Sequence, residues 1–295
     1  MSHPIIRGSL VALVTPFHED GSVNFEKLGE LVDFHLANQT DALVILGTTG
    51  ESSTMSHEED EAVVKYVLAR VNHRIPVICG SGSNCTQTML EKSLAYERLG
   101  ADGLLLITPY YNKTNEEGMY RHFTTIADAV KIPCILYNVP GRTGCSISET
   151  NVIRLAKHPN IVGIKEASGN ISYAARIARH LSDDFVMYSG NDDMIVPMLA
   201  LGASGVISVL ANVMPRETHQ MVVDFFEGRT DAARDAQLRL LELINNLFIE
   251  VNPVPVKEAL NLMGKDVGGF RLPLYPMTDE HRETLRRSMA AVGLL

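Results

Sequence analysis

Short apolar runs recur along the chain up to about residue 210, and segments with a helical spacing of apolar residues lie between them. Most of these runs are apolar at every position, which is typical of strands that are buried on both faces. We therefore expect eight strands, at Ser9–Val14, Ala42–Leu46, Pro76–Cys79, Gly103–Ile107, Cys134–Tyr137, Ile161–Lys165, Val186–Tyr188 and Gly205–Val209.

Helices are predicted between these strands. Apolar positions within residues 25–36 and 89–99 follow a roughly helical period. Ser56 and Ser148 are typical of helix starts, because a serine side chain can accept a hydrogen bond from the free N–H groups there. Gly100 and Gly202 stand where a helix should end.

Eight strand–helix units in sequence favour a parallel (β/α)8 barrel over an open, doubly wound sheet. The open sheet is the alternative, and it often carries a glycine-rich dinucleotide fingerprint. The segment Gly80–Cys85 lacks the third glycine of that fingerprint, and the chain has no phosphate-binding loop motif. We predict a barrel rather than a nucleotide-binding sheet.

The pattern changes after Pro215, where no further strands are predicted. Helical segments remain, including Asp231–Glu250 and Val256–Met263, and several prolines interrupt them. This part is longer than the last helix of a barrel needs to be. We expect a catalytic barrel over residues 1–228 and a C-terminal helical extension over residues 229–295, which is a candidate surface for oligomer contacts.

Composition narrows the classes of partner. The chain has 26 Lys and Arg against 35 Asp and Glu, for a net charge of −9, which counts against nucleic acid or an anionic membrane as a partner. No apolar stretch is long enough to span a membrane, and Met1–Pro4 does not begin a secretory signal. The 4 cysteines form no Cys-x-x-Cys pair. These features predict a cytoplasmic protein with reduced thiols.

In a (β/α)8 barrel the reactive groups lie at the C-terminal ends of the strands and in the loops that follow them. That rule selects five polar segments: Gly47–Ser52, Thr108–Asn112, Tyr137–Gly144, Lys165–Ser168 and Tyr188–Asp192. Two other chemistries are poorly supported. The 10 histidines show no metal-ligand spacing, and no G-x-S-x-G motif for a serine nucleophile occurs.

Lys165 is the most informative of these residues. It closes an apolar strand and, by the two-residue period, should share a face with Ile161 and Gly163. If that face is the barrel interior, desolvation lowers the pKa of the amine, which can then attack a ketone or aldehyde and form a Schiff base. Glu166 should point the other way. The alternative is a strand-end lysine that reaches solvent or pairs with a carboxylate.

Other polar residues near the same strand ends extend this hypothesis. Tyr137 ends the neighbouring strand, and its phenol could relay protons. The Gly47–Gly50 segment offers successive N–H groups and two hydroxyls that suit a carboxylate, although it could be only a tight turn. Arg142 could clamp a second carboxylate or be simply solvated. Tyr110 and Tyr111 could belong to the site or cap the core.

With these motifs the chain resembles the pyruvate-dependent class I aldolases of the N-acetylneuraminate lyase superfamily. The segments shared with the whole superfamily are Gly47–Glu51 and Ile164–Ala167, and the match extends over most of the chain from Gly8–Phe17 onward. Within the superfamily, Tyr137–Thr143 and Pro109–Lys113 are similar to the dihydrodipicolinate synthase branch. Sialic acid lyases and sugar-acid aldolases usually lack the arginine that stands here as Arg142.

The resemblance implies a lyase reaction of lysine and diaminopimelate biosynthesis. Lys165 would form a Schiff base with pyruvate, whose carboxylate the amides of Thr48 and Thr49 would hold, and no other cofactor or metal would be needed. Tyr137, Thr49 and Tyr111 would relay protons. The enamine would add to L-aspartate 4-semialdehyde, whose carboxylate Arg142 would bind, and ring closure would give 4-hydroxy-tetrahydrodipicolinate.

The resemblance also implies further residues and an oligomer. Gly190 and Ile207 match positions that lie near the pyruvate pocket through main-chain atoms. In the family the second loop tyrosine comes from a neighbouring subunit. A homodimer would therefore be the minimum active unit, and the usual assembly is a tetramer built as a dimer of dimers.

Regulation by lysine is the part of the family pattern that this chain matches least well. Feedback-inhibited members bind lysine at a subunit interface, and the matching positions here are Ser52, Ser53, His57, Asn84 and Tyr110. However, Asp60 stands where such members often have histidine, and Thr88 stands where they often have glutamate. We predict weak or absent inhibition by lysine.

Two alternative functions remain open from the sequence. Another Schiff-base aldolase, acting on a 2-keto-3-deoxy sugar acid or N-acetylneuraminate, would share Lys165 and Tyr137, so only the pocket for the second substrate separates the two. Arg142 favours a short aldehyde that carries a carboxylate. A noncatalytic barrel that senses a keto acid or an amino acid would be expected to have lost the lysine or the tyrosine, and neither is lost.

Overall fold

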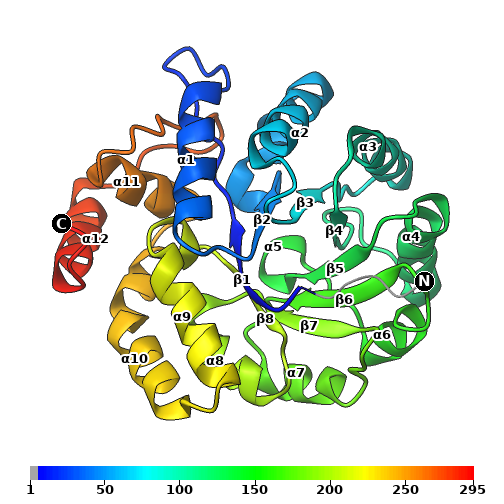
Figure 1. The fold of residues 1–295 in the computed structure, drawn as a ribbon. Helices are drawn as coiled ribbons and strands as arrows, with labels where there is room; N and C mark the ends of the chain where they lie inside the picture. Colours follow the sequence, from blue (N-terminus) through cyan, green and yellow to red (C-terminus); the bar gives the residue numbers. More distant parts are fainter. Residues whose placement is uncertain (1–5) are drawn as a thin grey trace.

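The strands of the computed structural model, which describes residues 6–295, close into a barrel in the order of the chain (Figure 1). All eight strand pairs are parallel, and β1 pairs with β8. The strands are β1 Gly8–Ala12, β2 Ala42–Ile45, β3 Val77–Gly80, β4 Gly103–Ile107, β5 Cys134–Asn138, β6 Ile161–Glu166, β7 Val186–Ser189 and β8 Gly205–Ser208. The predicted (β/α)8 barrel is confirmed, and no strand end differs from its expected position by more than two residues. The absence of a secretory signal was expected for Met1–Pro4, which lie outside the described residues.

Helices surround the barrel, and the predicted helix ends are confirmed. Ser56 and Ser148 are N-caps whose side chains accept hydrogen bonds from backbone N–H groups, and Gly100 caps a C-terminus in the left-handed conformation. The helices that follow β1 to β8 are α1 Phe25–Ala37, α2 His57–Val71, α3 Thr86–Leu99, α4 Glu116–Ala129, α5 Pro140–Thr143, α6 Glu149–Leu155, α7 Ile171–Ala178, α8 Ile195–Ala200 and α9 Pro215–Phe226. Four short 3₁₀ turns, η1 Thr48–Gly50, η2 Ser52–Thr54, η3 Asp192–Met194 and η4 Leu210–Asn212, follow β2, β7 and β8.

Two apolar clusters fill the molecule. The larger cluster lies between the strands and the helices, and the smaller one includes Leu10, Val44, Ile135 and Tyr137 on the strands' other face, inside the barrel. The interior cluster fills the barrel beneath the C-terminal ends of its strands. Polar residues at these strand ends are therefore held on a rigid apolar support.

One prediction about the strand faces is wrong. Ile161 belongs to the outer cluster and does not share the face of Lys165. The reason is a register shift against β5, where Cys134 and Ile135 pair with Ile161 and Gly163, so that Val162 is an extra residue and enters the interior cluster. Such a bulge changes the side on which the preceding residues point.

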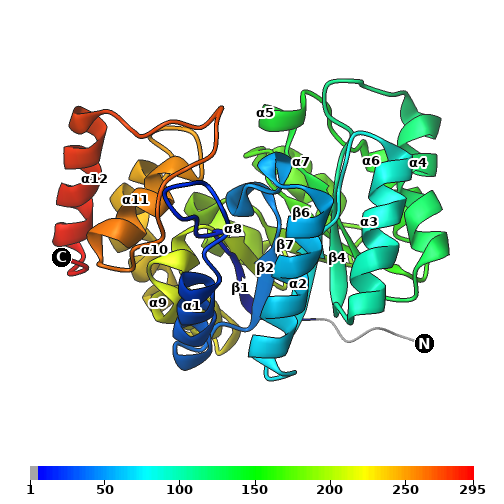
Figure 2. The same ribbon diagram turned by 90° about the horizontal axis from the view of Figure 1, so that it is seen from above.

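The chain after α9 is helical, as predicted, with α10 Thr230–Asn246, α11 Val254–Leu262 and α12 Asp279–Ala291. These helices lie together on the flank of the barrel next to α1 and α9, and the segment between α11 and α12 rises toward the barrel mouth (Figures 1 and 2). Helix α10 packs on α9 and α12. This flank therefore brings residues of the last quarter of the chain close to the ends of the strands.

Within residues 6–295 no helix has the length and apolar character needed to cross a bilayer. All four cysteines are free, and Cys79 and Cys134 are buried on strands as expected.

Candidate active site

A cavity of about 310 Å³ opens at the C-terminal ends of β5, β6 and β7. Its walls come from strand ends, from the turn after β2 and from the region after α10. The polar side chains in the lining include Thr49, Tyr137, Arg142, Lys165, Asp192 and Asn252. Residues far apart in the sequence thus share one site.

Lys165 lies at the centre of this cavity wall. It pairs in register with Tyr137 of β5 and Tyr188 of β7, and only 5% of its surface is exposed. Burial lowers the pKa of its amine to about 8, with Asp192 raising this pKa and Arg142 lowering it further. At pH 7 about a tenth of the amine is then uncharged, against about 0.03% for an ordinary lysine. The interior position and the lowered pKa are as predicted, and Lys165 does not reach solvent.

Tyr137 lies beside Lys165, whose Nζ is 4.5 Å from the centroid of its ring. Burial raises the pKa of the Tyr137 phenol, while Arg142 and a hydrogen bond with the side chain of Thr48 lower it. The phenol therefore keeps its proton at neutral pH. A protonated phenol within reach of an amine can donate to an oxygen that forms next to that amine.

The relay expected from the sequence differs from these contacts at one residue. The Oγ1 of Thr49 accepts a hydrogen bond from Asn252 Nδ2 at 2.9 Å, whereas the side chain of Thr48 interacts with Tyr137. Successive residues of a tight turn point to different sides. The relay role expected for Thr49 stays a prediction, and the contact with the phenol supports Thr48 in the same role.

The Thr48–Gly50 turn is well placed to bind an anion. The N–H of Gly50 donates to the Gly47 carbonyl, and the N–H of Glu51 donates to the Thr48 carbonyl. These two hydrogen bonds close the turn. The first N–H groups of such a turn have no partner inside it and remain available. Thr49 is buried, and the Oγ1 of Thr15 donates to the Gly50 carbonyl at 2.7 Å, which fixes the turn against the end of β1.

Arg142 lies on α5 at the exposed edge of the cavity. One of its terminal nitrogens donates to the Asn252 carbonyl at 3.1 Å. A guanidinium has five N–H donors, so most of them remain free for a carboxylate. Its charge also lies close enough to lower the pKa of Lys165.

Of the two residues expected near the pyruvate pocket, Gly190 lines the cavity and Ile207 lies in the apolar interior of the barrel. A Cβ added at Gly190 would lie 3.1 Å from Lys165 Cε and 2.6 Å from Ala167 Cβ. A glycine is therefore required for the close approach of β7 to Lys165. Ile207 is fully buried in the interior cluster below the cavity.

Tyr111 is not brought into this site within one chain. Its side chain is 91% exposed and its backbone is left-handed, with a φ of 67°. A large aromatic side chain rarely accepts either condition without a partner. Tyr111 therefore projects away from the barrel to which it belongs.

Two residues of the site had no predicted role. Asp192 is buried, with one carboxylate oxygen accepting from the N–H groups of Val209 and Leu210 at 2.9 and 2.8 Å, and burial raises its pKa. Its place after a strand end was visible in the sequence. Asn252 had no such signal, because it lies 203 residues from the Thr49 hydroxyl that it contacts.

A second cavity, of about 260 Å³, lies on the other side of the Thr48 turn. Ser52, Ser53, His57 and Tyr110 line it together with Thr88 and Lys92, as the resemblance implied for the first four. Asn84 is not in the lining, but its side chain donates to the Tyr110 carbonyl at 3.2 Å. Tyr137 contributes to both cavities and separates them.

Asp60 is already paired in the structure. Its carboxylate lies 2.7 Å from Lys92 Nζ, and only 1% and 11% of these side chains are exposed. No carboxylate is among the residues that line the second cavity. Across residues 6–295, no group of three or more His, Cys, Asp or Glu side chains gathers where a metal ion could be held.

Comparison with known proteins places these features in one family. The model of the dihydrodipicolinate synthetase family matches residues 5–292. The chain is 52% identical to the 4-hydroxy-tetrahydrodipicolinate synthase of Acetivibrio thermocellus, over all of both chains.

Solved structures agree with this match. The dihydrodipicolinate synthase of Acinetobacter baumannii, chloride-inhibited and complexed with pyruvate, is 43% identical, with a TM-score of 0.96 over 99% of this chain and 100% of that one. The DHDPS of Cyanidioschyzon merolae, solved with lysine bound, is 40% identical, with a TM-score of 0.96 over 98% and 99% of the two chains.

We expect the amine of Lys165 to titrate with a pKa of about 8 rather than at the ordinary value of 10.5, because its charged form loses water inside the barrel. Lysines labelled by carbon-13 reductive methylation should show one resonance that shifts through this range. That resonance should be missing in Lys165→Met. If the signal missing from Lys165→Met moves only above pH 10 in the wild type, the prediction is wrong.

Proposed function

We propose that Lys165 forms the Schiff base in this chain, which belongs to the dihydrodipicolinate synthetase family and condenses pyruvate with L-aspartate 4-semialdehyde. The product is 4-hydroxy-tetrahydrodipicolinate, in the diaminopimelate route to lysine. The observation that carries the proposal is the buried amine of Lys165, with its lowered pKa, beside the Tyr137 phenol.

The first step is attack of the uncharged Lys165 amine on the ketone carbon of pyruvate. The carbinolamine that forms loses water when its oxygen takes a proton, and the phenol of Tyr137 is placed to donate it. The side chain of Thr48 interacts with this phenol and serves as the next group in the proton relay. Loss of a proton from the methyl group of the imine then gives the enamine, with the nitrogen still bound to Lys165.

The pyruvate carboxylate is held by the Thr48–Gly50 turn in this proposal. The turn directs N–H groups into the site, and such groups bind an anion without bringing a charge that would change the pKa of Lys165. Gly190 leaves room on the opposite side of the Schiff base. No external cofactor is needed, because Lys165 itself activates the ketone.

The second substrate enters from the exposed edge of the cavity, where Arg142 binds its carboxylate. The enamine carbon attacks the aldehyde, and a new carbon–carbon bond forms. The amine of the second substrate then displaces Lys165 by transimination, which closes the ring and returns the free lysine. Arg142 thus acts mainly in the recognition of the aldehyde, and it bears on the first step only through its charge, which helps to lower the pKa of Lys165.

A second copy of the chain would complete the proton relay. Tyr111 is almost fully exposed and lies outside its own cavity, which supports a role in the site of a neighbouring subunit next to Thr48 and Tyr137. We propose a homo-oligomer built as a dimer of dimers. Residues 229–295 would form the extension to the barrel domain of residues 1–228, and a cytoplasmic location fits the free cysteines.

The lysine site is expected to be weak for an electrostatic reason. Asp60 is the acidic group among the described residues that the resemblance assigns to the lysine site. Its charge is already neutralised by Lys92. A free lysine would bring its ammonium to a wall that offers hydroxyls but no carboxylate. Binding a charge without a counter-charge costs more than the remaining hydrogen bonds return.

The Schiff base can be tested by trapping. Incubation with pyruvate and borohydride should inactivate the enzyme and add one reduced pyruvate to the peptide that contains Lys165, because reduction makes the imine permanent. Mass spectrometry of the digested protein identifies the residue. Lys165→Ala should take up no pyruvate, whereas the exposed-edge variant Arg142→Ala should still take it up. An adduct on a different lysine would contradict the proposal.

Arg142 should decide between the two aldolase functions. In an assay with pyruvate, Arg142→Ala should lower kcat/KM for aspartate semialdehyde by about 100-fold, the scale of a lost charged hydrogen-bond pair of about 3 kcal/mol. The rate of pyruvate trapping should stay within about twofold. The wild type should prefer aspartate semialdehyde to glyceraldehyde. A preference for glyceraldehyde would favour the sugar-acid alternative instead.

L-Lysine should bind weakly or not at all, because Asp60 is already paired with Lys92. Isothermal titration calorimetry should detect no binding with a Kd below about 1 mM. The Cyanidioschyzon merolae protein, which was solved with lysine bound, serves as the positive control. Tight binding by this chain, with loss of activity over the same range of concentration, would show that the prediction is wrong.

A further inference from the structure

A buried ion pair joins the Thr48–Gly50 turn to the C-terminal helices. Glu51 directly follows the turn, and its Oε1 accepts from Lys257 Nζ of α11 at 2.8 Å. Neither side chain has any exposed surface. The two residues are 206 positions apart in the sequence, so the contact ties the turn to a distant part of the chain.

Lys257 is held from several sides. Its Nζ also donates to the Gly269 carbonyl, and it lies 4.4 Å from the ring centroid of Phe17 and 5.2 Å from that of Phe270. An ammonium in this position gains from both aromatic faces. Burial lowers its pKa, and Glu51 acts in the opposite direction. These contacts fix the position of the ammonium, and the carboxylate of Glu51 can pair with it only at that position.

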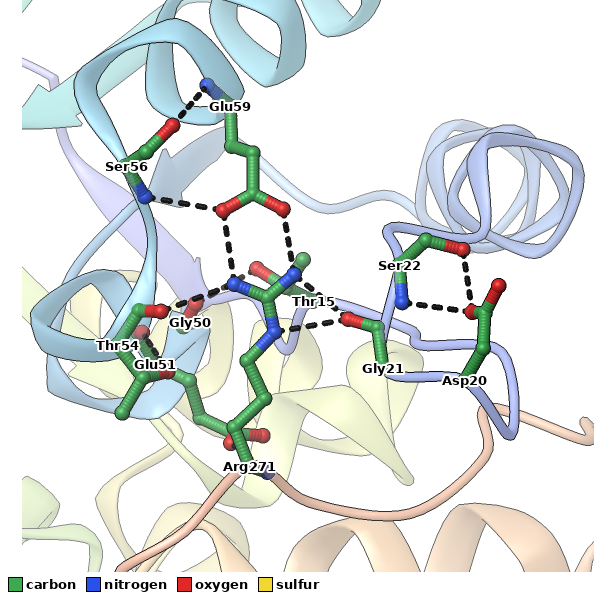
Figure 3. Close-up of polar contacts among 10 residues, drawn as sticks. All are labelled: Thr15, Asp20, Gly21, Ser22, Gly50, Glu51, Thr54, Ser56, Glu59 and Arg271. Carbon is green, nitrogen blue, oxygen red and sulfur yellow. Dashed lines mark hydrogen bonds and ion pairs between the residues drawn. The ribbon is translucent and has the colours of Figure 1, made fainter.

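The second oxygen of Glu51 is bound to the segment after α11. Its Oε2 accepts from the backbone N–H of Arg271 at 3.3 Å. Figure 3 shows the Arg271 side chain between the turn, the start of α2 and the loop near Gly21, where it pairs with Glu59 and donates to the carbonyls of Gly21 and Thr54. The segment that holds Glu51 is thus itself fixed to the barrel.

Asn252, just before α11, makes a parallel contact with the same turn. Its side chain donates to Thr49 Oγ1, and its carbonyl accepts from Arg142. This segment therefore touches the turn that would bind pyruvate and the arginine that would bind the second substrate. A further sign of constraint is the left-handed backbone of Glu51, with a φ of 54°, which is uncommon for a residue other than glycine.

We propose that Lys257 and Asn252 are positioning residues that fix the Thr48–Glu51 turn, and with it the carboxylate of pyruvate. Neither is proposed to take part in the chemistry. A buried pair of charges suits this purpose, because a displaced turn would leave both charges without a partner at a large energetic cost. The inference rests on the proposed function of the turn, and it assigns to the C-terminal helices a role in substrate affinity.

The test uses a pair of double variants of the full-length protein. Glu51→Gln with Lys257→Met removes both charges and nearly keeps the volume, so that no unpaired charge is left in the core. The matched control is Glu258→Gln with Arg282→Met, which removes a partly exposed ion pair between α11 and α12. In this pair Arg282 Nε donates to Glu258 Oε1, and among the described residues neither side chain bonds to the Thr48–Glu51 turn. Asn252→Ala is a third variant, which leaves the buried charges in place.

The readout is the pyruvate concentration that gives half-maximal borohydride trapping on Lys165. We expect it to rise about tenfold in Glu51→Gln/Lys257→Met and several-fold in Asn252→Ala, because the carboxylate site is displaced. KM for aspartate semialdehyde should change less than about twofold in the charge-pair variant. The Glu258/Arg282 control should match the wild type.

The outcomes separate this inference from the proposed function. If wild type gives no adduct on Lys165, the proposed function fails. Circular dichroism must first show that each variant is folded. If the wild type is trapped and a folded Glu51→Gln/Lys257→Met or Asn252→Ala variant reaches half-maximal trapping at the same pyruvate concentration as the wild type, the positioning role is overturned. A purely structural role would lower the amount of active enzyme and leave this concentration unchanged.

Discussion

The removal of Lys165 from water is the constraint on which the other features of the site depend. A lysine whose pKa falls from 10.5 to about 8 has its charged form destabilised by about 3 kcal/mol. The apolar barrel interior imposes this cost, and the packing of the eight strands that close the barrel offsets it. Gly190 is part of the same constraint, because a side chain there would occupy the space of the Lys165 stem. The free amine is therefore a product of the whole barrel and not of a single neighbour.

The acidity of the chain is compatible with two anionic substrates for the same reason. A net charge of −9 describes the average surface, whereas a cavity of this size responds to the few charges in its own wall. There Arg142 stands at the edge, Asp192 is buried and bound to backbone N–H groups, and the Thr48–Gly50 turn supplies uncharged donors. In the proposed function, local donors would thus set the affinity for a small carboxylate, and the global charge bears on large polyanions.

The sequence predicted those features that depend on local periodicity. Strand positions and the placement of Lys165 next to Tyr137 follow from apolar runs and from the rule that parallel strands end at one rim. The prediction of side-chain direction failed where a single extra residue changes the face of a strand. The extra residue Val162 turned Ile161 outward. In the tight turn the side chain of Thr48 interacts with the phenol, while that of Thr49 pairs with Asn252. Contacts such as Glu51 with Lys257 leave no local pattern, because an isolated charged residue on a helix is more often exposed than buried.

These long-range contacts change how the last quarter of the chain is understood. If α11 only packed on the barrel, apolar residues would do so at lower cost than a fully buried lysine and glutamate. An ion pair adds direction, since it is satisfied in one relative position of the turn and the helix and in no other. A turn that is proposed to bind an anion through its N–H groups needs such a fixed position, because hydrogen bonds to a carboxylate weaken steeply when the donors are misaligned. The C-terminal helices would thereby set the geometry of a site whose reacting groups all lie on the barrel.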